Sequence, residues 1–371
     1  MLTPRGRGAV ATIRLQGTAA LGVVTQLFRP LSGESLTSLP SASIVVGQWQ
    51  CKSSSHGERL VICLRAPEQI DVHCHGGWSA AAAVLMSLAE LGVDQITWED
   101  WLAAHGSDPI ASAALVALAS ACTERTATVL LDQYAGALRR EIESICDLLE
   151  ARDMAAAEAR LGELQASGLV GMRLTQPWRV VLCGRPNVGK SSLINAMVGY
   201  RRAIVHDRSG TTRDVVTAVT AWQGWPIELA DTAGIRETQG AVESAGIERA
   251  HREVESSDLV LLVADASHRW DNEDIRLADS LRVDLLIHNK ADIGVNCALR
   301  PAGWSTIATT GEGIDQLMSG IARHLLSRCP LPGAAVPFTC AQNTAISDAL
   351  VATQSADRDA ATTALTSLLA C

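Results

Sequence analysis

The sequence lacks the features that would place the protein in a membrane, outside the cell or on bulk nucleic acid. No apolar run approaches the roughly 20 residues of a transmembrane helix, and no charged segment followed by an apolar run opens the chain. The ten cysteines form no C-x-x-C pair, so we expect free thiols or small buried residues, not a disulfide framework. The net charge of −9 and the pI of about 5.5 mean that any contact with nucleic acid must be local or shared with a partner. We therefore expect a cytoplasmic protein with no membrane segment.

A chain of 371 residues has room for two or three domains. Residues 1–105 mix strand-like runs with one helical pattern, which predicts a small α+β domain. Residues 106–176 and 330–371 share an Ala- and Leu-rich composition, which together with helical spacing predicts one helical domain built from both segments. Residues 177–329 alternate strands and helices, which predicts an inserted α/β domain with a largely parallel sheet. The expected fold class is multidomain α/β.

A phosphate-binding loop is the strongest motif. Residues 184–191 fit the pattern G-x-x-x-x-G-K-S and lie between the apolar run 180–183 and a helical stretch. The glycines let the backbone wrap a phosphate chain, Lys190 can reach the β- and γ-phosphates, and Ser191 can ligate Mg²⁺. A chance match would rarely also lie between a strand and a helix. The first inference is therefore nucleotide binding.

A guanine-reading box follows later in the chain. Asn289, Lys290 and Asp292 match the pattern N-K-x-D after the apolar run 285–287. The carboxylate of Asp292 can accept hydrogen bonds from both the ring N–H and the exocyclic amine of guanine, whereas adenine presents no such pair of donors. GTP is therefore expected in preference to ATP.

Between these motifs, Asp231 opens a D-x-x-G turn that suits a sensor of the γ-phosphate and a water-mediated contact to Mg²⁺. The turn continues through Thr232, Ala233 and Gly234. Three boxes in this order predict a P-loop GTPase domain inserted in the helical domain.

Three further segments of this domain are less regular. Within residues 210–214, the hydroxyl of Thr212 can complete the Mg²⁺ shell when GTP orders the loop. On the guanine side, GTPases usually carry a Ser-Ala-Lys loop. Residues 307–309 stand in its place here, and only Ala308 matches it. Ile235 stands where many GTPases place the glutamine that orients the attacking water, and isoleucine cannot do that. The nearest acids are Glu237, Glu243 and Glu248, and the residues alone do not choose among them.

Taken together, these segments resemble the MnmE (TrmE) family of tRNA-modification GTPases. The similar segments are residues 184–192, 203–205, 210–215, 231–237 and 243–250 of the GTPase domain, and residues 4–10 and 13–17 near the N-terminus. The resemblance therefore includes both the N-terminal domain and the GTPase domain.

The resemblance implies that a potassium ion takes the place of an arginine finger during GTP hydrolysis. It implies that Asn187 binds this ion and that the loop carrying His206, Arg208 and Thr211 closes the ion site. It also matches Glu243 to the glutamate that orients the attacking water through a second water. Without the resemblance, Glu243 would be interpreted as a solvated acid at a helix start.

Together, the motifs and the resemblance predict contacts to the nucleotide and contacts to two metal ions. The expected nucleotide-contacting residues are Asn187, Val188, Gly189, Lys190, Ser191, Ser192, His206, Arg208, Thr211, Thr212, Asp231, Thr232, Ala233, Gly234, Asn289, Lys290, Asp292 and Ala308. The expected metal contacts are Ser191 and Thr212 for Mg²⁺, and Asn187, His206, Arg208 and Thr211 for K⁺.

For the rest of the chain, the resemblance implies that GTP-driven dimerisation is coupled to forming a 5-aminomethyl or 5-carboxymethylaminomethyl group on the wobble uridine of tRNA. The implied partner is an FAD-dependent MnmG-like protein, and the implied one-carbon donor is a folate derivative bound by the N-terminal domain. Arg14 matches a folate-contacting arginine, and Asp71 stands where a glutamate is usual. A lysine expected further on is not evident, and its place falls near His105.

The C-terminus departs from the family. The family ends in Cys-Ile-Gly-Lys, whose cysteine is needed for tRNA modification, while this chain keeps Cys371 without the motif. A thiol there either serves the same role or is inert. Two functions therefore remain: an MnmE-like enzyme of tRNA modification, or a GTP-driven switch or scaffold without one-carbon chemistry. Arg14, Asp71 and the turn at residues 75–77 favour the first, and the missing lysine and tail favour the second.

Overall fold

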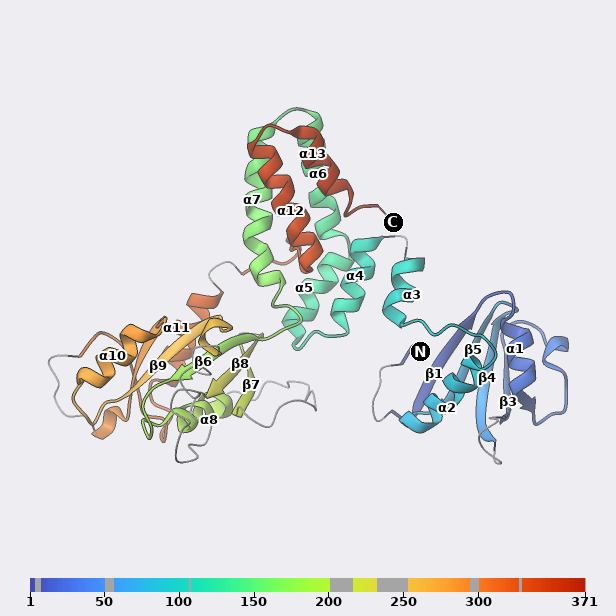
Figure 1. Cartoon of the computed structure of the whole chain (residues 1–371), viewed down its shortest axis with the longest axis horizontal. Helices are drawn as coiled ribbons and strands as arrows, with labels where there is room; N and C mark the ends of the chain where they lie inside the picture. Colours follow the sequence, from blue (N-terminus) through green and yellow to red (C-terminus); the bar gives the residue numbers. More distant parts are fainter. Residues whose placement is uncertain are drawn as a thin grey trace. The chain divides into compact units, whose positions relative to one another are not determined.

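The computed structural model describes residues 1–3, 8–50, 57–106, 108–200, 216–231, 253–293, 300–326 and 329–370. These residues form two compact units, Met1–His105 and Gly106–Cys371 (Figure 1). None of the described helices combines the length and the hydrophobicity needed to cross a bilayer.

The first unit is a five-stranded antiparallel sheet packed against helices. In sheet order the strands are β1 (Val10–Gln16), β5 (Gln69–His75), β4 (Glu58–Ala66), β3 (Ser43–Trp49) and β2 (Phe28–Pro30). Alternate residues such as Ile13, Ile62 and Val72 are buried in one core, as expected for a sheet with one covered face. Helices α1 (Ala20–Leu27) and α2 (Trp78–Ala89) contact β5, and α3 (Trp98–His105) ends the unit. The intervening strand residues, including Thr12, Arg14 and His73, belong to the other face.

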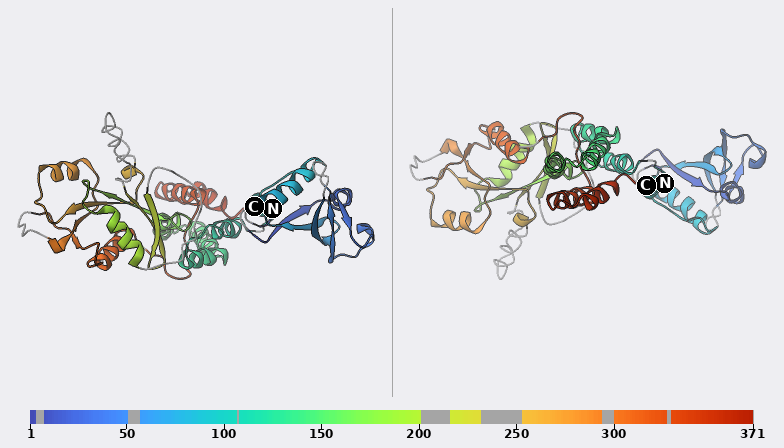
Figure 2. Two further views of the ribbon diagram at one scale, coloured as in Figure 1. Left: turned by 90° about the horizontal axis from the view of Figure 1, so that it is seen from below. Right: turned by 90° about the horizontal axis from the view of Figure 1, so that it is seen from above.

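The second unit begins and ends with helices that pack together. The first segment contributes α4 (Pro109–Leu118), α5 (Glu124–Tyr134), α6 (Ala137–Glu150) and α7 (Met154–Gly171), and the C-terminal segment contributes α12 (Cys340–Gln354) and α13 (Arg358–Thr366). In all views α12 lies beside α7 and α13 beside α6 (Figures 1 and 2). The prediction that the two helical segments pack together is therefore confirmed. Side chains of Asp108, Thr123 and Thr339 cap three of these helices.

The chain between the two helical segments forms a six-stranded sheet. In sheet order its strands are β11 (Trp304–Thr306), β10 (Leu285–Asn289), β9 (Leu259–Asp265), β6 (Trp178–Cys183), β8 (Trp225–Asp231) and β7 (Val216–Trp222). All pairings are parallel except that of the edge strand β7 with β8. The predicted α/β fold with a largely parallel sheet is thus confirmed.

Helices cover both faces of this sheet, as a parallel sheet requires. Helices α8 (Lys190–Tyr200) and α11 (Ile314–Leu325) contribute to the core on one face, and α10 (Asn272–Ser280) packs against the core on the other. The first of these cores is continuous with the core of the helical bundle, because one hydrophobic cluster includes Leu161, Trp225 and Ile346. The helices and the sheet are therefore joined by shared packing.

Candidate nucleotide-binding site

The predicted GTPase motifs meet at one edge of the six-stranded sheet. Strands β6, β8 and β10 end in the phosphate-binding loop, Asp231 and Asn289, and the intervening strand β9 ends in Asp265. The carboxyl ends of neighbouring parallel strands form the crevice in which open α/β sheets bind ligands. The order of the strands therefore brings together residues that are distant in the sequence, such as Asn187 and Lys290, which are 103 positions apart.

The two glycines of the phosphate-binding loop are required by its backbone. Gly184 has φ +147°, and a Cβ added there would lie 2.2 Å from the carbonyl oxygen of Val263. Gly189 has φ +95°, and an added Cβ would lie 2.4 Å from Nδ2 of Asn289. Only glycine fits both the conformation and the space at these positions. The motif is therefore held tightly between strands β9 and β10.

Lys190 begins α8 and is buried beneath the loop. Its Nζ donates hydrogen bonds to the carbonyl oxygens of Gly184, at 2.8 Å, and Arg185, at 2.9 Å. Burial lowers the pKa of Lys190, and the charge of Asp231 opposes this shift. An anionic phosphate in the loop would stabilise the ammonium form, so the side chain fits the predicted role.

Ser191 and Asp231 form an oxygen-rich pair. The hydroxyl of Ser191 donates to Oδ2 of Asp231 at 2.6 Å, and Asp231 is buried. Mg²⁺ prefers oxygen ligands, so the chemistry of this pair fits the predicted magnesium site. The neighbouring Ser192 is exposed in the first turn of α8.

Asn289 connects the phosphate side of the site to the guanine side. It is buried, and its Nδ2 donates to the carbonyl oxygen of Val188 at 3.0 Å. Its Oδ1 accepts hydrogen bonds from the Thr306 hydroxyl, at 3.2 Å, and from the backbone N–H of Ala308, at 3.3 Å. Ala308 therefore contributes through its backbone. The remaining guanine-box acid, Asp292, is exposed in the short 3₁₀ helix Ala291–Ile293.

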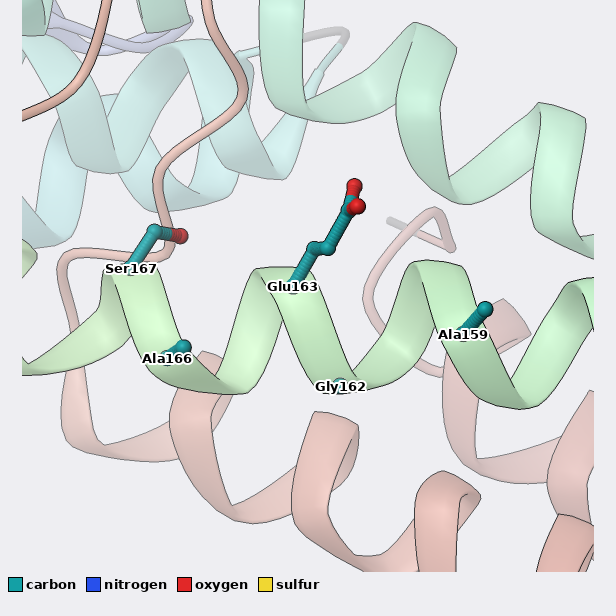
Figure 3. Close-up of a pocket in the computed structure, with 5 residues that line it drawn as sticks. All are labelled: Ala159, Gly162, Glu163, Ala166 and Ser167. Carbon is teal, nitrogen blue, oxygen red and sulfur yellow. The ribbon is translucent and has the colours of Figure 1, made fainter. Parts of the chain in front are cut away.

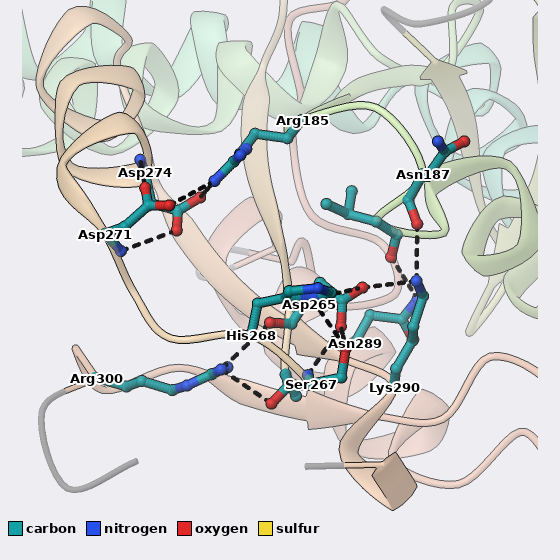
Figure 4. A network of polar contacts seen from close by, with 12 residues as sticks. Arg185, Asn187, Asp265, Ser267, His268, Asp271, Asp274, Asn289, Lys290 and Arg300 are labelled. Carbon is teal, nitrogen blue, oxygen red and sulfur yellow. Dashed lines mark hydrogen bonds and ion pairs between the residues drawn. The ribbon is translucent and has the colours of Figure 1, made fainter. Parts of the chain in front are cut away.

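Lys290 makes a second connection, shown in Figure 4. Its Nζ lies 2.8 Å from the backbone oxygen of Asn187 and 2.6 Å from Oδ2 of Asp265. Burial opposes ionisation of Asp265, but hydrogen bonds from Lys290 and Ser267 outweigh it and lower the pKa of Asp265 to about 2. The carboxylate of Asp265 is therefore ionised at neutral pH.

Arg185, the other cation of the phosphate-binding loop besides Lys190, is paired with carboxylates. Arg185 Nη1 lies 2.9 Å from Oδ2 of Asp271, and Nη2 lies 2.8 Å from Oε2 of Glu273. Asp274 is also close, at 3.8 Å (Figure 4). These acids surround the start of α10, so the guanidinium is held away from a role as a freely moving arginine finger.

Several predicted residues lie outside the described part of the chain. They are His206, Arg208, Thr211, Thr212, Thr232, Ala233, Gly234 and Glu243, together with Cys371. Of the predicted potassium contacts, the structure describes Asn187, whose φ is +63°. In Figure 4 its side-chain amide points away from the ammonium of Lys290.

In the first unit, Arg14 and Asp71 face each other across β1 and β5. Arg14 Nε donates to Oδ1 of Asp71 at 2.7 Å, and Nη2 donates to Oδ2 at 2.9 Å. A third residue, Arg65, donates to Oδ2 at 3.0 Å. The hydrogen bond from Arg14 lowers the pKa of Asp71 against the opposing effect of burial, and Arg65 lowers it further. His105 stacks on Trp101, with ring centroids 5.0 Å apart.

A pocket of about 490 Å³ lies elsewhere, along α7 (Figure 3). Its lining residues are Ala159, Gly162, Glu163, Ala166 and Ser167. These side chains come from a single helix and include one charged group, so they do not resemble a phosphate site.

Sequence reasoning missed three contributors: Asp265, Thr306 and Arg65. Asp265 had a usable signal, because it is a carboxylate at the end of an apolar strand, like Asp231. Thr306 and Arg65 lack such a signal. Their partners lie on strands whose adjacency and register only the fold determines.

Comparisons with known proteins identify relatives of this chain. The profile of the 50S ribosome-binding GTPase family matches residues 179–292. The tRNA modification GTPase MnmE of Moorella thermoacetica is 31% identical in an alignment that covers 91% of this chain and 84% of that protein. MnmE of Synechococcus sp. strain WH7803 is 34% identical, covering 87% and 79%. Among solved structures, the G domain of the T. maritima FeoB iron transporter is similar at 26% identity with a TM-score of 0.31, covering 40% of this chain and 99% of that chain.

Proposed function

The chain belongs to the MnmE family of tRNA modification GTPases, and from this membership we propose that it hydrolyses GTP, with Mg²⁺ and potassium, to modify the 5-position of the wobble uridine in tRNA. The observation that carries the proposal is the contact of Asn289 with both Val188 and Ala308. One amide thereby links the loop that would hold phosphate to the loop that would hold guanine. A tRNA substrate also implies a cytoplasmic location.

On the phosphate side, the chain's own groups bind and orient the nucleotide. Backbone N–H groups of the loop and the start of α8 would hold the phosphate oxygens, and Lys190 would donate to the β- and γ-phosphates. Ser191, with Asp231 behind it, would hold Mg²⁺, and Asn187 would hold potassium. The two cations would supply charge neutralisation at the phosphates. From the family membership we infer that Glu243 orients the attacking water, a role that Ile235 cannot fill.

On the guanine side, Asp292 would accept hydrogen bonds from the base. Its exposed carboxylate lies on the loop that directly follows Lys290, where a base could approach. Ala308 lies on the same side, where its backbone N–H holds the side chain of Asn289. Rejection of adenine follows, because adenine presents no matching pair of donors and would leave the carboxylate without hydrogen bonds once the base covers it.

We propose a division of labour among three domains. Residues 177–329 bind and hydrolyse GTP, and residues 106–176 with 330–371 form a helical domain for tRNA and an MnmG-like FAD protein. Residues 1–105 dimerise and hold a folate derivative.

The Arg14, Arg65 and Asp71 cluster supports a folate site by its charge. Two guanidinium groups face one carboxylate, which leaves one positive charge for an anionic ligand such as the carboxylate tail of a folate. Asp71 already accepts hydrogen bonds from both arginines. We therefore infer that the arginines, rather than Asp71, would contact the ligand.

An alternative function rests on His105. Its ring stacks on Trp101 near the place where the resemblance leads us to expect a lysine, so no ammonium group is provided by that position. This favours a GTP-driven regulatory switch or scaffold that has kept GTPase activity and lost tRNA modification.

Mass spectrometry of wobble uridine separates the two functions. The chain is expressed, with an MnmG-like protein from its own source, in cells lacking their own MnmE. We expect 5-substituted uridine to be restored, and Lys190→Ala, which removes the phosphate-binding ammonium, to restore none. Bare uridine from a folded chain that hydrolyses GTP would instead establish the switch.

A further inference from the structure

Asp265 lies at the centre of the nucleotide site without belonging to any of its motifs. It ends β9, the strand between β6, which leads into the phosphate-binding loop, and β10, which leads into the guanine box. Its register partner on β10 is Asn289. Its carboxylate therefore lies between the two loops that bind opposite ends of a nucleotide.

The carboxylate of Asp265 is itself fixed in place. Oδ1 accepts from the backbone N–H of Ser267, at 2.8 Å, and from its hydroxyl, at 2.5 Å. Nη2 of Arg300 donates to the backbone oxygens of Asp265, at 3.3 Å, and Ala266, at 2.9 Å (Figure 4). The side chain of Asp265 is only 11% exposed. Oδ2, which His268 Nδ1 also approaches at 3.5 Å, is therefore presented to Lys290 from a rigid support, at 2.6 Å.

Lys290 needs such a support. A lysine side chain gives up much of its rotamer entropy when it is held in one conformation. Here it leaves a backbone with φ +61° and reaches both the backbone oxygen of Asn187 and Oδ2 of Asp265. The Asn187 carbonyl alone is a neutral acceptor, whereas the carboxylate forms the stronger, charge-assisted bond.

We propose that Asp265 is a positioning residue for nucleotide binding: it holds Lys290 so that the guanine box and the phosphate-binding loop are fixed to each other before the nucleotide arrives. The inference rests on the proposed GTPase function and adds to it a residue outside the recognised boxes. Fixing Lys290 in advance raises the affinity for the nucleotide, because this side chain then need not lose conformational entropy when the nucleotide binds. Asp265 acts through Lys290, so it should affect binding and leave the hydrolysis step unchanged.

The test uses the full chain with the substitution Asp265→Asn, which keeps the shape and removes the charge. We expect dissociation of a fluorescent GDP analogue to become roughly five- to tenfold faster, in line with a charge-assisted hydrogen bond that is partly exposed. KM for GTP should rise by a similar factor, while kcat stays within twofold. If a folded variant releases GDP at the wild-type rate, or loses kcat in proportion to kcat/KM, the proposal is wrong.

A matched control comes from the opposite edge of the same sheet. Oδ2 of Asp284 accepts a hydrogen bond from the backbone N–H of Val260 at the start of β9, at 2.8 Å. Asp284→Asn should therefore weaken the same strand without changing GDP release. If Asp284→Asn accelerates release as much as Asp265→Asn does, a purely structural role explains both and the proposal fails.

A double-mutant cycle tests whether Asp265 acts through Lys290. In the Lys290→Met background, Asp265→Asn should produce no further acceleration, and full additivity would contradict the proposal. Asp265→Ser provides a second uncharged variant should Asp265→Asn not fold, with the same expected acceleration. The GDP measurement also separates a failure of the proposed GTPase function from a failure of the proposed role of Asp265. A wild-type chain that binds GDP but does not hydrolyse GTP would refute the proposed enzyme and leave the role of Asp265 open to measurement.

Discussion

At the scale of single residues, the proposed selection of guanine depends on one exposed carboxylate, that of Asp292. Asp292→Asn should shift the preference of the protein from GTP toward xanthosine triphosphate, because xanthine carries a carbonyl where guanine carries its amine and an asparagine amide can donate to it. We expect GTP affinity to fall by roughly 100-fold or more, since mismatched hydrogen-bonding groups discriminate strongly. Competition between the two nucleotides for a fluorescent GDP analogue measures the shift.

The control for this substitution is Asp279→Asn, which removes an equally exposed carboxylate from α10 and should leave base preference unchanged. Continued preference for GTP in Asp292→Asn would remove Asp292 from guanine recognition.

Single residues also show what could be predicted from sequence. Lys190, Ser191 and Asn289 were predictable because each belongs to a motif whose spacing is set by one turn. The hydrogen-bonding partners of the site residues were harder to predict from the sequence. Thr306 meets Asn289 only because β11 lies beside β10, and Arg65 reaches Asp71 beside a register shift between Leu64 and Ala66.

At the scale of elements, the β7–β8 hairpin rests on the start of α5. The Thr123 hydroxyl donates to the carbonyl oxygen of Gly224 at 2.6 Å, and Arg125 donates to that of Gln223 at 2.9 Å. Arg125 also lies over the ring of the buried Trp225, 5.3 Å from its centroid. The turn of the hairpin thus contacts the helices, while its far end holds Asp231 opposite Val216.

The hairpin turn gives a stability prediction. Gly224 has φ +82°, and a Cβ added there would lie 2.9 Å from Cβ of Arg125. Gly224→Ala should therefore combine backbone strain with a clash and lower the free energy of unfolding by about 2 kcal/mol. For a unit of this size the melting temperature should fall by roughly 5 °C, measured by calorimetry.

Gly162→Ala is the matched control, because it places the same methyl group in open space on α7. There alanine replaces glycine within a helix, so the melting temperature should stay constant or rise. Equal behaviour of the two variants would show that the hairpin turn does not depend on its contact with α5.

Elements were easier to predict than their contacts. Buried strands such as β6 and β9 are nearly continuous apolar runs, and the helical segments carry clear spacing, so their positions were evident. The contact between the hairpin and α5 was not, because Thr123 and Gly224 lie 101 residues apart and their meeting depends on how the sheet is inserted between the helices.

At the scale of the whole molecule, insertion keeps the GTPase sheet and the helices in one folded unit. The chain leaves the bundle after α7 and returns at α12, which packs against α7. The buried Gln133 secures the return, because its Nε2 donates to the carbonyl oxygen of Ala334, at 3.0 Å, and its Oε1 accepts from the N–H of Val336, at 3.1 Å. A change at the nucleotide site therefore acts on a sheet that is packed against the helices.

Potassium-dependent self-association is the prediction that belongs to this scale. If potassium completes the charge at the phosphates of paired GTPase domains, GDP with aluminium fluoride should increase the association of copies in potassium and not in sodium at equal ionic strength. Light scattering measures the mass, and phosphate release should be at least tenfold faster in potassium. Asn187→Gly, which tolerates φ +63° but removes the side chain, should abolish both effects while GDP still binds. Equal mass and equal rate in the two salts would mean that the positive charge comes from the protein, and since Arg185 is paired with Asp271 and Glu273, it would have to come from another residue.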